Sequence, residues 1–184
     1  MEEGDHHRRG LLGGGAPIEM GGKIPIVTFI GKSSSGKTTL LVKLIPELKR
    51  RGYRVASIKH SHHNVTMDKE GKDSWRHREA GAEMVVLVSG NTVSFVREFP
   101  EEPDVELIRD RFMDGADIIL AEGFKWTDLP KIWVFREGNS QSIIKKDDSL
   151  IAVVSDEEAE TDLPWVNIDD IKGVADLVET TFLI

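Results

Sequence analysis

The sequence of 184 residues contains no cysteine. Disulfides, thiolate metal sites and cysteine nucleophiles are therefore excluded, which fits a reducing cytoplasm. Long apolar runs are also lacking. The longest, such as residues 84–88 and 118–121, fall far short of the roughly 20 residues that cross a bilayer. We therefore expect a soluble cytoplasmic protein without a membrane partner.

Positive charge is scarcer than negative charge. The chain has 24 Lys and Arg against 32 Asp and Glu, a formal net charge of −8 and a sequence pI of about 5.3. A net acidic surface repels phosphate backbones, which argues against a nucleic-acid partner. Any phosphate that this protein binds must be held by a local arrangement of groups.

Length and composition predict one compact domain over residues 23–184, because a chain of this size with 39% hydrophobic residues can bury one sizeable core. Residues 1–22 are rich in glycine, carry mixed charges and lack an apolar stretch typical of a signal peptide. We interpret this segment as a flexible N-terminal tail.

Short apolar runs alternate with segments of helical periodicity along the domain. The runs predict strands at residues 24–30, 53–58, 117–121, 132–135, 151–154 and 165–168, and the periodicity predicts helices at 38–51, 76–80, 105–113 and 169–182. Residues 84–88 and 92–96 flank Ser-Gly-Asn, which is typical of a hairpin. The pattern predicts a three-layer α/β fold with a mostly parallel sheet, helices on both faces and the hairpin as its antiparallel edge.

The run Gly-Lys-Ser-Ser-Ser-Gly-Lys-Thr at residues 31–38 lies between the first predicted strand and the first predicted helix. This is the setting in which backbone N–H groups and a helix N-terminus converge on phosphate oxygens. Lys37 is expected to reach the β- and γ-phosphates and Thr38 to bind Mg²⁺ through its hydroxyl. A serine- and glycine-rich turn that merely precedes a helix is the structural alternative. The motif predicts a P-loop nucleoside triphosphate fold.

A magnesium site of this kind also needs a carboxylate. Glu122 ends a predicted buried strand and is followed by Gly123, so its side chain should emerge at the carboxyl edge of the sheet, where ligands bind in α/β folds. An ordinary charged residue at a strand end is the alternative interpretation.

A long polar segment, residues 59–74, follows the second predicted strand, and loops of this length usually have a function. Lys59, His60 or Asp68 is expected near the γ-phosphate or Mg²⁺. The histidines at positions 60, 62 and 63 lack the spacing of zinc signatures, so a tight metal site is disfavoured, and a solvated surface loop remains an alternative.

Four segments together resemble the molybdopterin-guanine dinucleotide biosynthesis adaptor family, MobB. They are residues 31–39, residues 59–63, residues 71–74 with 80–82, and the Ala-Glu-Gly-Phe-Lys run at 121–125. Lys131-Ile132 and Ser155-Asp156 also match the family pattern.

The resemblance implies a dimeric, Mg²⁺-dependent GTP-binding adaptor of the SIMIBI class with weak GTPase activity. Its implied partners are a guanine nucleotide, a second copy, a MobA-like molybdenum cofactor guanylyltransferase and apo-molybdoenzymes. Guanine preference is part of the resemblance, because the chain has no Asn-Lys-x-Asp motif, and Asp156 is the candidate acceptor for guanine N1 and N2.

These interpretations define the candidate site residues. The catalytic candidates are Lys37, Glu122 and Asp68, and the metal-binding candidates are Thr38, Glu122 and Asp68. The nucleotide-binding candidates are Gly31, Lys32, Ser33, Ser34, Ser35, Gly36, Lys37, Thr38, Thr39, Lys59, His60, Gly123 and Asp156.

Two other functions remain open from the residues alone. A small-molecule kinase would use residues 59–78 as a lid, with Arg76 and Arg78 on phosphates. A dimeric regulatory ATPase similar to MinD would use Lys32 across its interface, although a solvated lysine is the plainer interpretation. Arg97 is a further charge donor with no predicted target.

Overall fold

The structure is a computed structural model that describes residues 22–61, 69–137 and 147–184. The predicted tail lies outside the described residues except for Gly22. In chain order the elements are β1 (Ile26–Ile30), α1 (Lys37–Arg50), β2 (Val55–Lys59), α2 (Asp73–Glu79), β3 (Met84–Ser89), β4 (Thr92–Arg97), α3 (Val105–Phe112), β5 (Ile118–Glu122), β6 (Lys131–Phe135), β7 (Leu150–Ser155), β8 (Trp165–Asn167) and α4 (Ile171–Phe182).

Six strands form one sheet in the order β2-β5-β1-β6-β7-β8, and every neighbouring pair is parallel. In β1 and in β5, four of the five residues are buried, which explains why these strands are continuous apolar runs in the sequence. Parallel pairing places the carboxyl ends of all six strands at one edge of the sheet. The segments that follow β1, β2, β5 and β7 therefore meet there.

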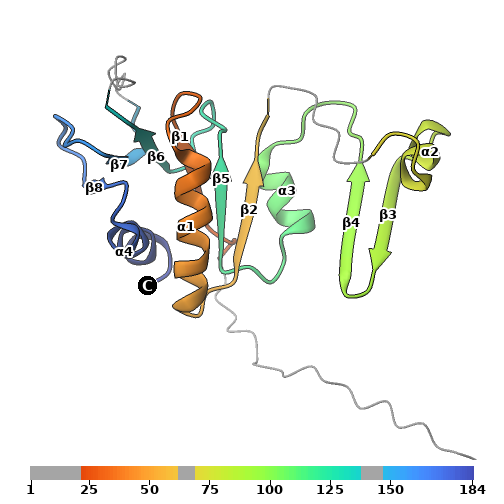
Figure 1. The fold of residues 1–184 in the computed structure, drawn as a ribbon, viewed down its shortest axis with the longest axis horizontal. Coiled ribbons are helices and arrows are strands. Elements are labelled where there is room, and N and C mark those ends of the chain that lie inside the picture. The colour runs from red at the N-terminus through yellow and green to blue at the C-terminus, as the bar shows by residue number, and fades with distance from the viewer. Residues whose placement is uncertain (1–21, 62–68, 138–146) are drawn as a thin grey trace, which may run out of the picture.

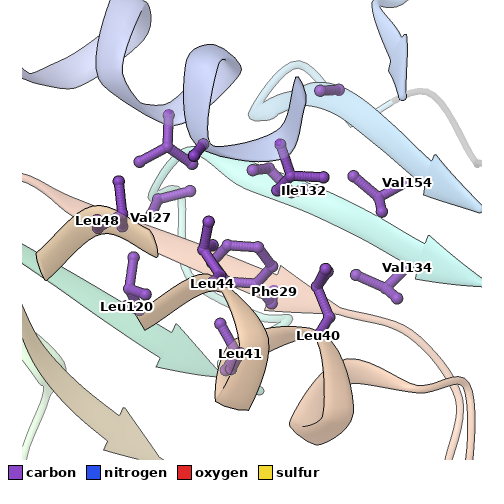
Figure 2. Close-up of a cluster of buried hydrophobic side chains, with 14 of the residues drawn as sticks. Val27, Phe29, Leu40, Leu41, Leu44, Leu48, Leu120, Ile132, Val134 and Val154 are labelled. Carbon is purple, nitrogen blue, oxygen red and sulfur yellow. The ribbon is translucent and has the colours of Figure 1, made fainter. Parts of the chain in front are cut away.

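One face of the sheet is covered by α1 and α4, which lie side by side in Figure 1. Figure 2 shows Leu40, Leu44 and Leu48 of α1 packed over Val27 and Phe29 of β1. The leucines recur every four residues and so share one face of the helix, and none of the five side chains is more than 1% exposed. This packing holds the N-terminus of α1 against the end of β1.

The opposite face of the sheet carries α3. Side chains alternate along β1, so Ile26 points away from α1 and clusters with Val105 of α3 and with Ile119 and Ala121 of β5. Helices therefore lie on both faces, and the predicted three-layer α/β fold class is confirmed.

The hairpin differs from its prediction in one respect. β3 and β4 pair in antiparallel register as expected, but they form a two-stranded sheet of their own rather than an edge of the six-stranded sheet. Figure 1 shows them with α2 beyond β2. Leu87 is 57% exposed, Val88 65% and Val93 62%, so these apolar side chains do not pack into the core. A strand pattern in the sequence predicts pairing but not the partner, which accounts for the error.

The starts of two helices differ from prediction by two or three residues. The second helix begins at Asp73, three residues before the predicted start, because the acidic side chain of Asp73 is favourable in a first helical turn. The last helix begins at Ile171, two residues after the predicted start, and the Asp170 carboxylate caps it by accepting a hydrogen bond from the backbone N–H of Gly173 at 3.0 Å.

Among the residues that the structure describes, no helix combines the length and the apolar character that would let it cross a membrane.

Candidate nucleotide site

The segment 31–36 joins the buried strand β1 to α1 at the carboxyl edge of the sheet. A Cβ atom on Gly31 would lie 2.1 Å from the carbonyl oxygen of Val134, so only glycine fits there. Gly36 has a φ of 95° and Ser34 a φ of 62°, both in the left-handed region. Left-handed residues between right-handed ones turn successive backbone N–H groups toward one concave surface, and such a surface suits an anion.

The helix that follows leaves its first N–H groups without a side-chain cap from the described residues. α1 has 14 residues and begins directly at Lys37, so its positive dipole end opens onto the concave loop. Uncapped N–H groups and the helix dipole together favour a phosphate at this point.

Lys37 folds back over the loop. Its Nζ donates hydrogen bonds to the carbonyl oxygens of Gly31 at 3.0 Å and Lys32 at 2.6 Å, and lies 3.4 Å from Ser35 Oγ. Burial lowers the pKa of the Lys37 ammonium below its usual value, while Glu122 opposes this shift and Lys59 adds to it. An anion in the loop would offset the cost of holding this charge away from water.

Thr38 and Glu122, 84 positions apart in the chain, lie in direct contact. The Thr38 hydroxyl oxygen is 2.8 Å from Oε1 and 2.9 Å from Oε2 of the Glu122 carboxylate. Lys59 Nζ lies 3.2 Å from the same carboxylate. Parallel pairing explains this meeting, because Glu122 is in register with Phe29 on one side and with Lys59 on the other.

The Thr38 hydroxyl and the Glu122 carboxylate are hard oxygen donors, the kind that Mg²⁺ prefers. Within the described ranges, no group of three or more His, Asp or Glu side chains is arranged to hold a metal ion by itself. A Mg²⁺ ion at this position would therefore take its remaining ligands from phosphate and water, as it does in nucleotide sites. The residues present fit such an ion.

His60 and Gly123 follow β2 and β5 and close the far side of the site. The backbone N–H of His60 donates to the Glu122 carbonyl at 2.9 Å, and the N–H of Gly123 donates to the Phe29 carbonyl at 3.1 Å. Gly123 has a φ of 102°, and a Cβ atom on it would lie 3.2 Å from His60 Cβ. The ring of His60 is fixed through Nε2, 2.7 Å from a carboxylate oxygen of Glu102.

The other candidate side chains in and after the loop differ in how exposed they are. Lys32 and Ser33 line a cavity beside the loop, Ser35 is buried, and Thr39 is exposed on the first turn of α1. The candidate Asp68 lies outside the described residues, as do the histidines at positions 62 and 63. Their roles stay predictions.

Asp156 follows β7 at the same edge of the sheet. Its Oδ1 accepts a hydrogen bond from the backbone N–H of Glu137 at 2.8 Å, and its Oδ2 lies 3.3 Å from Nη1 of Arg136. Arg136 in turn covers the loop, because a Cβ atom on Gly36 would lie 3.1 Å from its Nε. Sequence reasoning missed Arg136, although a charged residue directly after a buried strand was the signal that selected Glu122.

The cavity beside the loop has a volume of about 300 Å³. Its wall contains two aromatic residues, the buried Phe124, which the sequence analysis named only as part of the 121–125 run, and the half-exposed Trp126, which it missed. Their signal was their place immediately after the Glu122-Gly123 pair.

The chain matches the family model for molybdopterin guanine dinucleotide synthesis protein B (MobB) over residues 26–156. The chain belongs to the MobB family. A curated MobB relative, the molybdopterin-guanine dinucleotide biosynthesis adapter protein of Haemophilus influenzae, is 40% identical over 163 residues, covering 88% of this chain and 92% of the relative. The adapter protein of Escherichia coli is 42% identical over 167 residues, covering 86% and 95%.

Solved MobB structures share the fold. A crystal structure of molybdopterin-guanine biosynthesis protein B aligns with a TM-score of 0.70 at 29% identity, covering 85% of this chain and 98% of that one. The crystal structure of Bacillus subtilis MobB aligns with a TM-score of 0.65 at 25% identity, covering 86% and 98%. The matched residues 26–156 include every site residue described above.

Proposed function

We propose that this chain is a Mg²⁺-dependent GTP-binding adapter of molybdopterin guanine dinucleotide biosynthesis, acting in the cytoplasm with weak GTPase activity. The observation that carries the nucleotide assignment is the contact of Thr38 and Lys59 with the Glu122 carboxylate beside the loop that Lys37 spans. The adapter role is supported by the family and by relatives that cover nearly the whole chain.

In this proposal the triphosphate lies in the concave loop at the start of α1. Lys37 exchanges its contacts with the loop carbonyls for oxygens of the β- and γ-phosphates, where its positive charge is compensated. Thr38 and Glu122 would hold the Mg²⁺ ion, which would neutralise charge on the triphosphate. Lys59, 3.4 Å from the Thr38 hydroxyl, then neutralises charge at the γ-phosphate end.

Slow hydrolysis follows from the residues available to stabilise the transition state. Phosphoryl transfer depends on positioning and charge neutralisation, commonly by a water-orienting glutamine and an arginine finger. Among the described arginines that were candidates, Arg78 lies 3.7 Å from Glu98, and Arg97 lies over the ring of Phe99.

Guanine preference is assigned to Asp156. Its Oδ1 is held by the backbone N–H of Glu137 at 2.8 Å, whereas its Oδ2 lies at a longer 3.3 Å from Nη1 of Arg136. The N1 and N2 donors of guanine can replace Arg136 at this oxygen, and adenine lacks both donors in that position. We expect Asp156→Asn to reduce the affinity ratio of GTP to ATP at least tenfold while ATP binding changes little.

The proposal includes a homodimer formed through the hairpin. Its exposed apolar side chains at Val86, Leu87, Val88 and Val93 form a surface of the kind that is buried between subunits, and among the described residues β3 and β4 pair only with each other, which leaves their outer edges to a second copy. A MobA-like guanylyltransferase and apo-molybdoenzymes are the proposed partners of the dimer, through the pathway that the relatives serve.

The test is a calorimetric titration of the full chain with GTP and with ATP, each with Mg²⁺ and with EDTA. We expect GTP to bind more tightly than ATP and EDTA to weaken binding at least tenfold. Glu122→Gln should remove most of the Mg²⁺ dependence, whereas Glu83→Gln, an exposed glutamate before β3, should leave it intact. Equal affinity for GTP and ATP would refute the guanine assignment, and equal affinity with and without Mg²⁺ would refute the metal site.

A further inference from the structure

The cavity beside the phosphate loop has two chemically different ends. At one end lie Gly31, Lys32, Ser33 and Lys37 of the loop. At the other end lie His60, Phe124, Lys125 and Trp126. Backbone N–H groups and a lysine suffice to hold phosphates, so the proposed nucleotide accounts for the first end and leaves the aromatic end unexplained.

The aromatic end is built from three rings in mutual contact. The ring of His60 meets Trp126 edge to face, with centroids 4.5 Å apart and planes at 79°, and meets Phe124 at 5.4 Å and 62°. Phe124 and Trp126 lie 5.8 Å apart. A carboxylate oxygen of Glu102 lies 2.7 Å from Nε2 of His60 and holds the His60 ring in place. These contacts arrange the wall before any ligand arrives, which lowers the entropic cost of binding.

The backbone that presents these rings is itself constrained. Phe124 has a φ of 56°, which is unusual for a bulky residue, and Thr127 donates to the Phe124 carbonyl from both its N–H at 3.2 Å and its hydroxyl at 2.9 Å. Strained residues of this kind cluster where a structure must hold a side chain in a set place. The tight turn directs Trp126 into the wall of the cavity while 52% of its surface stays exposed.

The charges around the cavity favour an anion. Lys125 lies at the aromatic end, Lys32 and Lys37 lie at the loop end, and Glu122, the one carboxylate among the described residues that line the cavity, contacts Lys59 and Thr38. This local excess of positive charge stands in a chain whose net charge is −8. The whole cavity, of about 300 Å³, lies at the small end of ligand pockets, so its aromatic end suits a small compound rather than a polymer.

We propose that the aromatic end binds a second ligand, a planar fused-ring heteroaromatic anion, with its ring against Trp126 and its charge toward Lys125. The ligand then lies beyond the γ-phosphate end of the nucleotide, within reach of Lys37. This placement rests on the proposed nucleotide site, but the binding of the second ligand does not.

The experiment titrates the full chain with pterin-6-carboxylate, a fluorescent two-ring anion, and follows the change in ligand fluorescence. We expect saturable binding that Trp126→Ala weakens at least tenfold, because stacking of a base on an aromatic side chain has an effect of that size. Trp126→Phe should restore most of the affinity. Trp75→Ala, which removes a tryptophan that does not line the cavity, is the matched control and should bind as wild type does.

Further titrations distinguish the contribution of the ligand's ring from that of its charge, and the aromatic end of the cavity from the nucleotide site. Uncharged pterin and benzoate should each bind more weakly than pterin-6-carboxylate, and Lys125→Ala should weaken only the charged ligands. The proposal is overturned by the absence of saturable binding, by equal affinity in Trp126→Ala, or by complete displacement of the pterin by Mg²⁺·GDP, which would assign the rings to the nucleotide base.

Failure of this inference can be told apart from failure of the nucleotide proposal. Lys37→Ala should lose GTP and keep pterin-6-carboxylate, whereas Trp126→Ala should lose pterin-6-carboxylate and keep GTP. A chain that binds only the pterin refutes the nucleotide site alone, and a chain that binds only GTP refutes the second ligand alone.

Discussion

The central strand β1 and the hairpin strand β3 are both short runs of apolar residues, yet the chain uses them in opposite ways. In β1 (Ile26–Ile30) four of five residues are buried between helices on two faces. In β3 (Met84–Ser89) one of six residues is half-buried and the others are exposed. The comparison teaches that apolar composition identifies a strand, whereas the neighbouring elements decide whether it becomes core or an unpartnered surface.

The largest expected effect separates the two regions by stability. Leu44→Ala removes a fully buried side chain from between α1 and β1 and should lower the free energy of unfolding by about 2–5 kcal/mol. The matched substitution Leu87→Ala on β3, at 57% exposure, should change it by at most about 0.5 kcal/mol. Urea unfolding gives the free energy of unfolding of both variants. Similar losses at the two sites would break the comparison.

The next effect concerns assembly rather than folding. Val88→Glu places a charge on the exposed hairpin surface, which should weaken the proposed dimer at least tenfold because the charge would be desolvated in the interface. The melting temperature of the monomer should stay within a few degrees. Analytical ultracentrifugation gives the dimer dissociation constant. A dimer of unchanged strength would mean that the hairpin is not its interface.

The smallest expected effects concern two ion pairs, one in the six-stranded sheet and one beside the hairpin. Lys131 Nζ of β6, 3% exposed, lies 2.8 Å from the Asp147 carboxylate, and its hydrogen bond, with that of Ser149, lowers the pKa of Asp147 to about 2. The pair therefore stabilises the fold above the ordinary carboxyl pKa of about 3.9, and this contribution is lost as the pH falls through about 2.

Asp147→Asn should lower the free energy of unfolding by about 1 kcal/mol at pH 7, a value that allows for the 38% exposure of the Asp147 side chain. The difference in the free energy of unfolding between this variant and wild type should narrow below pH 4. Beside the hairpin, the Glu98 carboxylate lies 3.7 Å from Arg78 Nε and its side chain is 74% exposed. Glu98→Gln should therefore have no measurable effect on the free energy of unfolding. Urea unfolding from pH 7 to pH 3 tests both. A pH-independent gap for Asp147→Asn would contradict the account.

Sequence reasoning predicted most of the sheet because four of its strands, β1, β5, β6 and β7, are largely buried. Such strands are continuous apolar runs, and the carboxyl-edge rule then brings Glu122 toward the loop, where the structure finds it 2.8 Å from Thr38. The same reasoning did not separate the hairpin from the sheet, because the pairing partner of a strand depends on tertiary contacts that no local pattern encodes.

The site residues that sequence reasoning missed share a physical cause. Arg136 and Trp126 belong to no motif, and their place in the site depends on how neighbouring strands end rather than on local spacing. Arg136 reaches the loop because β6 lies beside β1, and Trp126 lines the cavity because a turn at Phe124 directs it there. Residue contacts of this kind become visible only when the strand order is known.

The most direct test of the central claim is the affinity of Lys37→Ala for Mg²⁺·GTP, with Lys43→Ala as the matched control. Lys43 is also on α1 but lies 3.6 Å from Asp169, away from the loop. We expect Lys37→Ala to weaken GTP binding at least a hundredfold, because it removes the charge that spans the loop, and Lys43→Ala to bind as wild type does. Unchanged GTP affinity in Lys37→Ala would contradict the assignment of the loop at residues 31–38 as the nucleotide site.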